Sequence, residues 1–146
     1  MKKFFLLILL PVIFVAFLQA DYIYVVNSES RTLSRIDTET GTVINTFTQL
    51  GLTPNMLKVN NDYIYVVLSG ANSIQMIDRN SGTTIRNIFI ASSSNPWDVV
   101  ENNGYLYVSG MFTNKVYKIS QESWTVVDQI TVGTAPEGLE VCNGKL

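Results

Sequence analysis

Short apolar segments rich in Tyr, Val and Ile alternate with short polar segments throughout residues 21–146. β-Branched and aromatic residues favour strands, and the intervening Asn, Asp, Gly and Ser residues favour the tight turns of antiparallel hairpins. The pattern therefore predicts an all-β protein built from many short strands.

The same pattern occurs three times. The copies begin at Tyr22, Tyr63 and Tyr105, so they are spaced by 41 and then 42 residues. Repeats of about 40–45 residues that contain several short strands are typical of the blades of a β-propeller. We expect the repeats to span residues 21–61, 62–103 and 104–144, and each blade to be a four-stranded antiparallel sheet.

Four strands, A to D, are expected in each repeat. Strand A is predicted at 56–59, 97–100 and 138–141, strand B at 22–26, 63–67 and 105–109, strand C at 32–37, 73–78 and 115–120, and strand D at 42–47, 83–89 and 125–132. Strand B is apolar on both faces, as expected if each blade is covered on both sides. Its repeated Tyr pairs favour packing between blades over a platform for stacking sugars or bases. Strand C alternates more clearly, with Ile74 and Met76 against Ser73 and Gln75, so we expect it nearer the rim.

The order of the predicted strands leaves a ring incomplete. After residue 20 the sequence begins with a strand B, and it ends after a strand A that has no blade of its own. Propellers close with four to eight blades, and an arc of three would leave two large apolar faces open to water. We therefore expect a fragment of a larger ring, for example one of seven blades. Self-association of short arcs through the open blade faces is the alternative.

The first twenty residues have the features of a secretory signal peptide. Lys2 and Lys3 precede an apolar stretch from Phe4 to Leu18, and the segment ends at Ala20. The stretch is shorter than the roughly 20 residues of a membrane-spanning helix and fits a signal cleaved after Ala20. An uncleaved anchor is the alternative. We expect a secreted, periplasmic or cell-surface protein with no membrane insertion after cleavage.

Charge and composition exclude several function classes. Two of the ten basic residues lie in the signal segment, so eight remain beside twelve acidic residues. A mildly acidic domain without a basic cluster does not fit nucleic acid. The sequence contains no histidine, which removes Ser-His-Asp and Cys-His catalysis from this segment, and it has no phosphate-binding loop or metal-ligand spacing. We predict no catalytic residue, metal site or cofactor here. Cys142 is the single cysteine, so no disulfide forms within the chain.

Asp37 and Asp78 open two short turns that end at Gly41 and Gly82. Oxygen side chains before a Gly also occur in Ca²⁺ loops, but the distal bidentate Glu of such loops is missing here. We therefore expect each Asp to accept hydrogen bonds from backbone amides of its own turn, with the Gly at positive φ.

The first copy reads Tyr-Val-Val-Asn at 24–27 and Ile-Asp-Thr-Glu-Thr-Gly-Thr-Val at 36–43, and the second reads Tyr-Val-Val at 65–67 and Ile-Asp-Arg-Asn-Ser-Gly at 77–82. This order resembles the YVTN-type β-propeller repeat of exported bacterial and archaeal proteins. The third copy departs from it at Ser120 and at Trp124, which replaces the turn Gly. The resemblance implies a propeller fold in an exported, surface-layer-like protein. That family also includes relatives of sugar lactonases and quinoprotein dehydrogenases, so it does not fix an activity.

The candidate binding loop contains Asn95, Pro96, Trp97 and Asp98. It places a large aromatic side chain beside a carboxylate at the entry to a strand A, where the loops of a propeller surround its central channel. Glu137 follows the matching Pro in the next repeat, so Asp98 and Glu137 could line one acidic opening. A Trp that fills space between blades is the alternative.

We expect an exported, non-catalytic scaffold that binds an unknown protein, glycan or cell-envelope partner. The alternative function is the N-terminal part of a lactonase-like or quinoprotein-like propeller enzyme, whose active-site residues would lie in blades outside this sequence.

Overall fold

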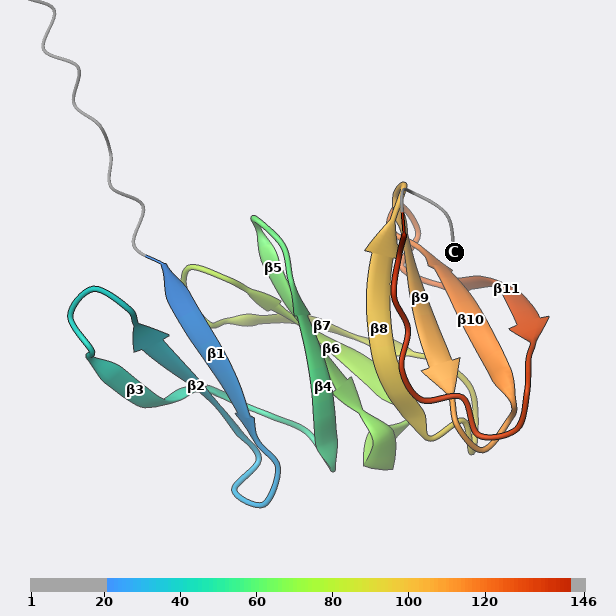
Figure 1. Ribbon diagram of the computed structural model, residues 1–146, viewed down its shortest axis with the longest axis horizontal. Helices are drawn as coiled ribbons and strands as arrows, with labels where there is room; N and C mark the ends of the chain where they lie inside the picture. The colour runs from blue at the N-terminus through green and yellow to red at the C-terminus, as the bar shows by residue number, and fades with distance from the viewer. Residues whose placement is uncertain (1–20, 143–146) are drawn as a thin grey trace, which may run out of the picture.

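The computed structural model describes residues 21–142, so the predicted signal peptide and residues 143–146 lie outside it. Three antiparallel sheets follow one another along the long axis of the molecule (Figure 1). Their faces are stacked against each other, which confirms the predicted all-β architecture of propeller blades. Within the described residues, no helix is long and apolar enough to cross a membrane.

We call the sheets blades 1, 2 and 3. Blade 1 contains β1 (Tyr22–Asn27), β2 (Thr32–Asp37) and β3 (Val43–Gln49). Blade 2 contains β4 (Pro54–Val59), β5 (Tyr63–Leu68), β6 (Ser73–Asp78) and β7 (Thr84–Phe89), with a short 3-10 turn, η1 (Ser69–Ala71), between β5 and β6. Blade 3 contains β8 (Pro96–Asn102), β9 (Tyr105–Gly110), β10 (Lys115–Ser120) and β11 (Val126–Thr131). Neighbouring strands in each sheet are consecutive in sequence.

Within residues 21–142 blade 1 has no strand A, as predicted, and β1 is therefore an edge strand. The predicted third strand A at 138–141 is wrong, because this segment belongs to no strand. Strand A pairs with the strand B of its own blade, as β4 does with β5 and β8 with β9. The described residues supply no strand B after 138–141, so the segment has no ladder to join.

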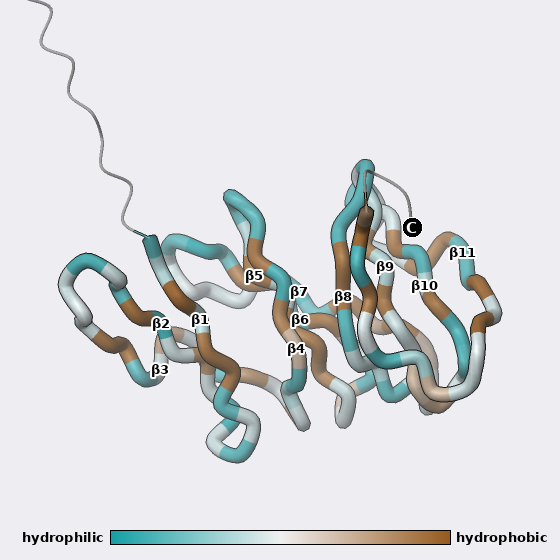
Figure 2. Tube along the Cα trace, in the orientation of Figure 1, coloured by the Kyte–Doolittle hydropathy of each residue, from teal (hydrophilic) through white to brown (hydrophobic). Residues whose placement is uncertain are grey.

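The hydrophobic core lies between the blades. Strand β5 sends Ile64 and Val66 into the cluster shared with blade 1, and Tyr65 and Val67 into the cluster shared with blade 3. All four are fully buried. The period-two alternation of a strand therefore serves two interfaces at once, which confirms that strand B is buried on both faces. Figure 2 shows apolar colour along the strands and polar colour at many of the turns.

The second Tyr of strand B packs between blades in blades 1 and 2, as the repetition predicted. The Tyr24 hydroxyl donates to the Arg79 carbonyl of blade 2 at 3.3 Å. One blade further on, the Tyr65 hydroxyl accepts from Gln121 Nε2 at 3.1 Å, and its ring lies 6.4 Å from that of Trp124. Burial raises the pKa of Tyr65 to about 12. The second Tyr of strand B thus reaches the C–D turn of the following blade.

Strand C of blade 2, β6, lies nearer the rim than strand B, as predicted, but its polar side chains are not exposed. Ser73 and Gln75 are buried along with their apolar neighbours. Gln75 Nε2 donates to the Gln49 carbonyl at 3.0 Å and to Thr84 Oγ1 at 2.8 Å, and Gln75 Oε1 accepts from the Gly51 amide at 3.1 Å. A polar side chain is tolerated inside because its hydrogen bonds are satisfied.

Candidate functional site

Two kinds of loop meet at one face of the arc, which we call the loop face. In blade 2 the start of β4, the end of β5, the start of β6 and the end of β7 are paired side by side. The linkers 50–53 and 90–95 between blades, and the B–C loops 28–31, 69–72 and 111–114, therefore all lie at this edge. The candidate loop belongs to this face.

A left-handed residue fixes each B–C loop against the following linker. It is Arg31 in blade 1, Asn72 in blade 2 and Asn114 in blade 3, with φ of 54°, 50° and 55°. In each case its carbonyl accepts from the first residue after strand D, at 2.8 to 3.0 Å. The side-chain Oδ1 of Asn72 and of Asn114 also accepts a linker amide, from Asn95 and Ala135 respectively, each at 3.0 Å. Blade 1 has no such side-chain acceptor because it carries Arg31.

Asn95 and Pro96 have structural positions in the loop face. Asn95 adopts a positive φ of 43°, and its Nδ2 lies 3.6 Å from Met111 Sδ. Pro96 is buried and opens β8 opposite Gly110. These two residues hold the linker against the B–C loop of blade 3 and set where Trp97 begins.

Asp98 and Glu137 are brought together, but through the Glu137 backbone and not through its carboxylate. Asp98 Oδ2 accepts from the Leu139 amide at 2.9 Å, and Oδ1 accepts from the Val99 amide at 2.8 Å. Ser109 Oγ accepts from the Asp98 amide at 3.1 Å and donates to the Glu137 carbonyl at 2.6 Å. The Asp98 carboxylate therefore holds the segment after Pro136 in place, and the Glu137 side chain is exposed.

Trp97 is the remaining side chain of the candidate loop. It is half-buried, and within residues 21–142 its indole nitrogen has no hydrogen-bond partner. An indole usually finds a partner for its N–H when it is buried. Of the five predicted site residues, Trp97 and Glu137 are therefore the two whose polar side-chain groups make no hydrogen bond within the described residues.

The acidic turns behave as the sequence predicted. Asp37 Oδ1 accepts from the amides of Glu39 and Thr40 at 3.0 and 2.8 Å, and Gly41 has a φ of 70°. Hydrogen bonds from the Thr40 backbone hold the pKa of the Asp37 carboxyl below its ordinary value. Asp78 makes the same turn, and the Ser81 amide lowers its pKa likewise. In the third copy Trp124 takes the place of the Gly with a φ of 57°.

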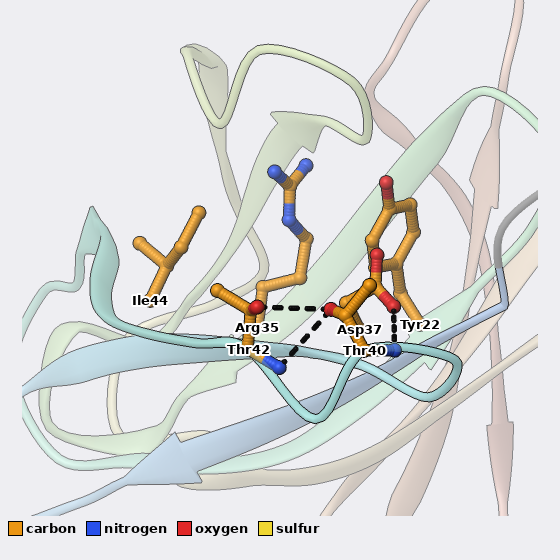
Figure 3. A pocket seen from close by; sticks show the side chains of 6 residues that line it. All are labelled: Tyr22, Arg35, Asp37, Thr40, Thr42 and Ile44. Atoms are coloured by element: carbon orange, nitrogen blue, oxygen red, sulfur yellow. Dashed lines mark hydrogen bonds between the residues drawn. The ribbon is translucent and has the colours of Figure 1, made fainter.

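A small pocket of about 180 Å³ beside the first of these turns was not anticipated from the sequence. Figure 3 shows Arg35 between Tyr22 and Ile44 on its wall, next to the hydrogen-bonded turn of Asp37. The Arg35 guanidinium lies 4.5 Å from the centre of the Tyr22 ring and 4.3 Å from that of Phe47.

Arg35 Nη1 also donates to the Asn80 carbonyl of blade 2 at 3.4 Å. The cation is thus already engaged in joining two blades, and the pocket contains no free charged group of the kind that would bind an anion. In the sequence, the only signal for this pocket is a cation in predicted strand C, which pairs with the Tyr-rich strand B.

Within the described residues, no three His, Cys, Asp or Glu side chains lie close enough to hold a metal ion. Cys142 is exposed and unpaired in the structure.

A scan of known protein families finds no match to the sequence, and a search of curated proteins finds none either. Solved structures do match the fold. A streptogramin B lyase matches with a TM-score of 0.68 at 15% identity over 80% of this chain and 40% of that chain. Apo AztD from Citrobacter koseri matches with a TM-score of 0.66 at 16% identity over 81% and 33%.

A third match is a catalytically inactive virginiamycin B lyase from Staphylococcus aureus, bound to quinupristin, in which a histidine is replaced by alanine. Its TM-score is 0.62 at 17% identity over 81% of this chain and 44% of that chain. At these identities the matches show the fold alone. The chain has the blade arrangement of β-propeller proteins. It covers 33%, 40% and 44% of the length of AztD, the streptogramin B lyase and the virginiamycin B lyase, respectively.

Proposed function

We propose that this protein is an exported β-propeller scaffold of the YVTN type that binds a protein, glycan or cell-envelope partner through its loop face. Export is inferred from the charge and apolar pattern of residues 1–20, and the YVTN assignment from the repeat residues. N-terminal sequencing of the exported protein, with Asp21 as the first residue, tests the export step.

The observation that carries the binding function is how the polar side chains are used. Asp98 is committed to backbone amides, and Glu101 accepts from Asn60 and Gln121 at 2.8 Å each. Carboxylates bound in this way position chain segments and are not free to move protons. Trp97, at the start of β8 beside the loop face, is half-buried and its N–H has no hydrogen-bond partner within the described residues, and Trp is a frequent anchor of binding interfaces.

A propeller enzyme is the second candidate, because two of the matched structures are lyases. One of them is inactive when a histidine is replaced by alanine, and this sequence has no histidine. An enzymatic function would therefore require residues from blades outside this sequence. Lyase-like or lactonase-like activity of a longer protein that includes such blades would favour this second candidate over the scaffold.

The binding test is co-sedimentation of the purified protein with isolated bacterial cell envelopes, before and after protease treatment of the envelopes. We expect saturable binding that Trp97→Ala weakens about tenfold or more, since interface aromatics often contribute 2 kcal/mol or more. Ile85→Ala is the control, because it removes an exposed apolar side chain near the start of β7, at the end of the strand away from the loop face, and it should bind as the wild type does. Equal binding by both variants would contradict the proposal. Loss of binding after protease treatment would identify a protein partner.

A further inference from the structure

The outer face of blade 1 carries residues that the other blades bury completely. Ile23 is 52% exposed and Val25 is 38% exposed. The residues at the same repeat positions are Ile64 and Val66 in blade 2 and Leu106 and Val108 in blade 3, and all four are 0% exposed. Blades 2 and 3 bury these positions against the preceding blade. Ile23 and Val25 therefore form an exposed apolar face of the kind that is covered by a neighbouring blade elsewhere in this protein.

Among the described residues, blade 1 also has one strand fewer than blades 2 and 3. Its strand B, β1, pairs only with β2, whereas β5 and β9 each pair with a strand A on their other side. The free edge of β1 is a row of backbone donors and acceptors suited to an extended segment.

The opposite end of the arc presents such a segment. Residues 136–141, with the sequence Pro-Glu-Gly-Leu-Glu-Val, occupy the repeat position of a strand A. Leu139 and Val141 pack against the outer face of blade 3, on a cluster that includes Val100 and Tyr107. Asp98 and Ser109 anchor the backbone there. The segment is held in an inter-blade position, yet it belongs to no strand. In Figure 1 it runs beside β8 and β9, at the far end of the molecule from β1.

We propose that residues 136–142 of one copy form the missing strand A of blade 1 in a second copy. The pairing of β8 with β9 sets the register, because Val99 is opposite Val108 and Asn102 is opposite Tyr105. By repeat position, Leu139 is then opposite Val25 of the other copy, and Cys142 is opposite its Tyr22.

The contact joins unlike surfaces, so it must either close into a ring or continue as a fibre. Two copies of the three blades formed by residues 21–142 give six blades, which is within the range of closed propellers. The apolar residues at the other end, Ile130 at 47% exposure and Val132 at 38%, would be covered by the same contact. Their repeat equivalents in blade 2, Ile88 and Ile90, are already buried against blade 3.

A disulfide trap tests the register. The Tyr22→Cys variant of the full chain retains Cys142, and paired strand positions are close enough for a disulfide. Because the two residues lie at opposite ends of one copy, a bond that forms rapidly under mild oxidation between the introduced thiol and Cys142 must join two copies. We expect a reducible dimer within minutes, and a linkage confirmed by mass spectrometry of the peptides. Glu29→Cys, which places an exposed thiol beyond the other end of β1, is the matched control and should link much more slowly.

Light scattering of the unmodified protein gives an independent measurement. We expect twice the monomer mass, and we expect Val25→Glu to give a monomer with unchanged circular dichroism, because the Val25 side chain is exposed in a single copy. A monomeric wild type, open-ended polymers, or equal linking rates of the two cysteine variants would each overturn the proposal. None of these readouts depends on a bound ligand, so they are separate from the test of the proposed binding function.

Discussion

Blades 2 and 3 are joined by a polar cluster that the structure places at the edge opposite the loop face. Asn60 Nδ2 donates to Glu101 Oε2, and Gln121 Nε2 donates to Glu101 Oε1, both at 2.8 Å. Gln121 Nε2 also donates to the Tyr65 hydroxyl at 3.1 Å. Glu101 is half-buried and is the acceptor at the centre of this cluster. The substitution Glu101→Ala should therefore weaken the packing of the two blades.

The expected loss follows from these two hydrogen bonds. A hydrogen bond to a charged group contributes about 1.5–3 kcal/mol, but partial exposure of Glu101 reduces this through solvent screening. We expect Glu101→Ala to lower the free energy of unfolding by about 2 kcal/mol, equivalent to a Tm lower by about 6–12 °C for a domain of this size. Tyr65→Phe should cost about 1 kcal/mol, since it removes one neutral hydrogen bond.

Urea unfolding followed by Trp fluorescence measures both losses. Glu122→Ala is the matched control, because Glu122 is exposed and its carboxylate has no hydrogen bond within the described residues. A double-mutant cycle of Glu101→Ala with Tyr65→Phe should show coupling of about 0.5 kcal/mol or more through the shared Gln121. If Glu101→Ala unfolds at the same urea concentration as Glu122→Ala, the cluster does not join the blades and the reasoning is refuted.

Two further predictions follow from the repeats. Arg31→Asn should raise the free energy of unfolding by about 1 kcal/mol, because Asn tolerates the left-handed conformation and its side chain can accept the linker amide of Thr53, as Asn72 does for the next linker. Arg31→Ala is the control and should not raise the free energy of unfolding. If Arg31→Ala stabilises the protein as much as Arg31→Asn does, the explanation is wrong. Hydrogen bonds from the amides of its turn lower the pKa of Asp78 from 3.8. The stability that the ionised Asp78 contributes is therefore present above the unfolded-state pKa. This stability is lost as the pH falls through 3.8 and then through the lower folded-state pKa. Asp78→Asn should therefore flatten the loss of stability between about pH 5 and pH 3, and an unchanged pH profile in urea unfolding would count against the turn hydrogen bonds.

Much of the fold is predictable from the sequence because each strand is local. Strands B and C have sharp ends, since Tyr and Val runs stop at Asn, Asp and Gly residues that cannot continue a ladder. The turn at Asp78 is predictable for the same reason, because its hydrogen bonds reach only two or three residues along the chain.

What the sequence does not reveal depends on contacts between blades. Gln75 looks like an exposed rim residue until its partners Gln49 and Thr84 are known. The candidate loop shows the same limit. Asp98 beside Trp97 suggests a binding pair, but whether its carboxylate is free depends on Leu139, which is 41 residues away in sequence.

In the assembled protein we expect every blade, including blade 1, to be four-stranded and buried between two neighbours. Hydrogen exchange followed by NMR on the assembled protein tests this directly at the β1 amides that do not pair with β2. We expect these amides to exchange as slowly as the matching amides of β9, which are bonded to β8. Exchange of the β1 amides at the rate of an open strand edge, with β9 fully protected, would contradict it.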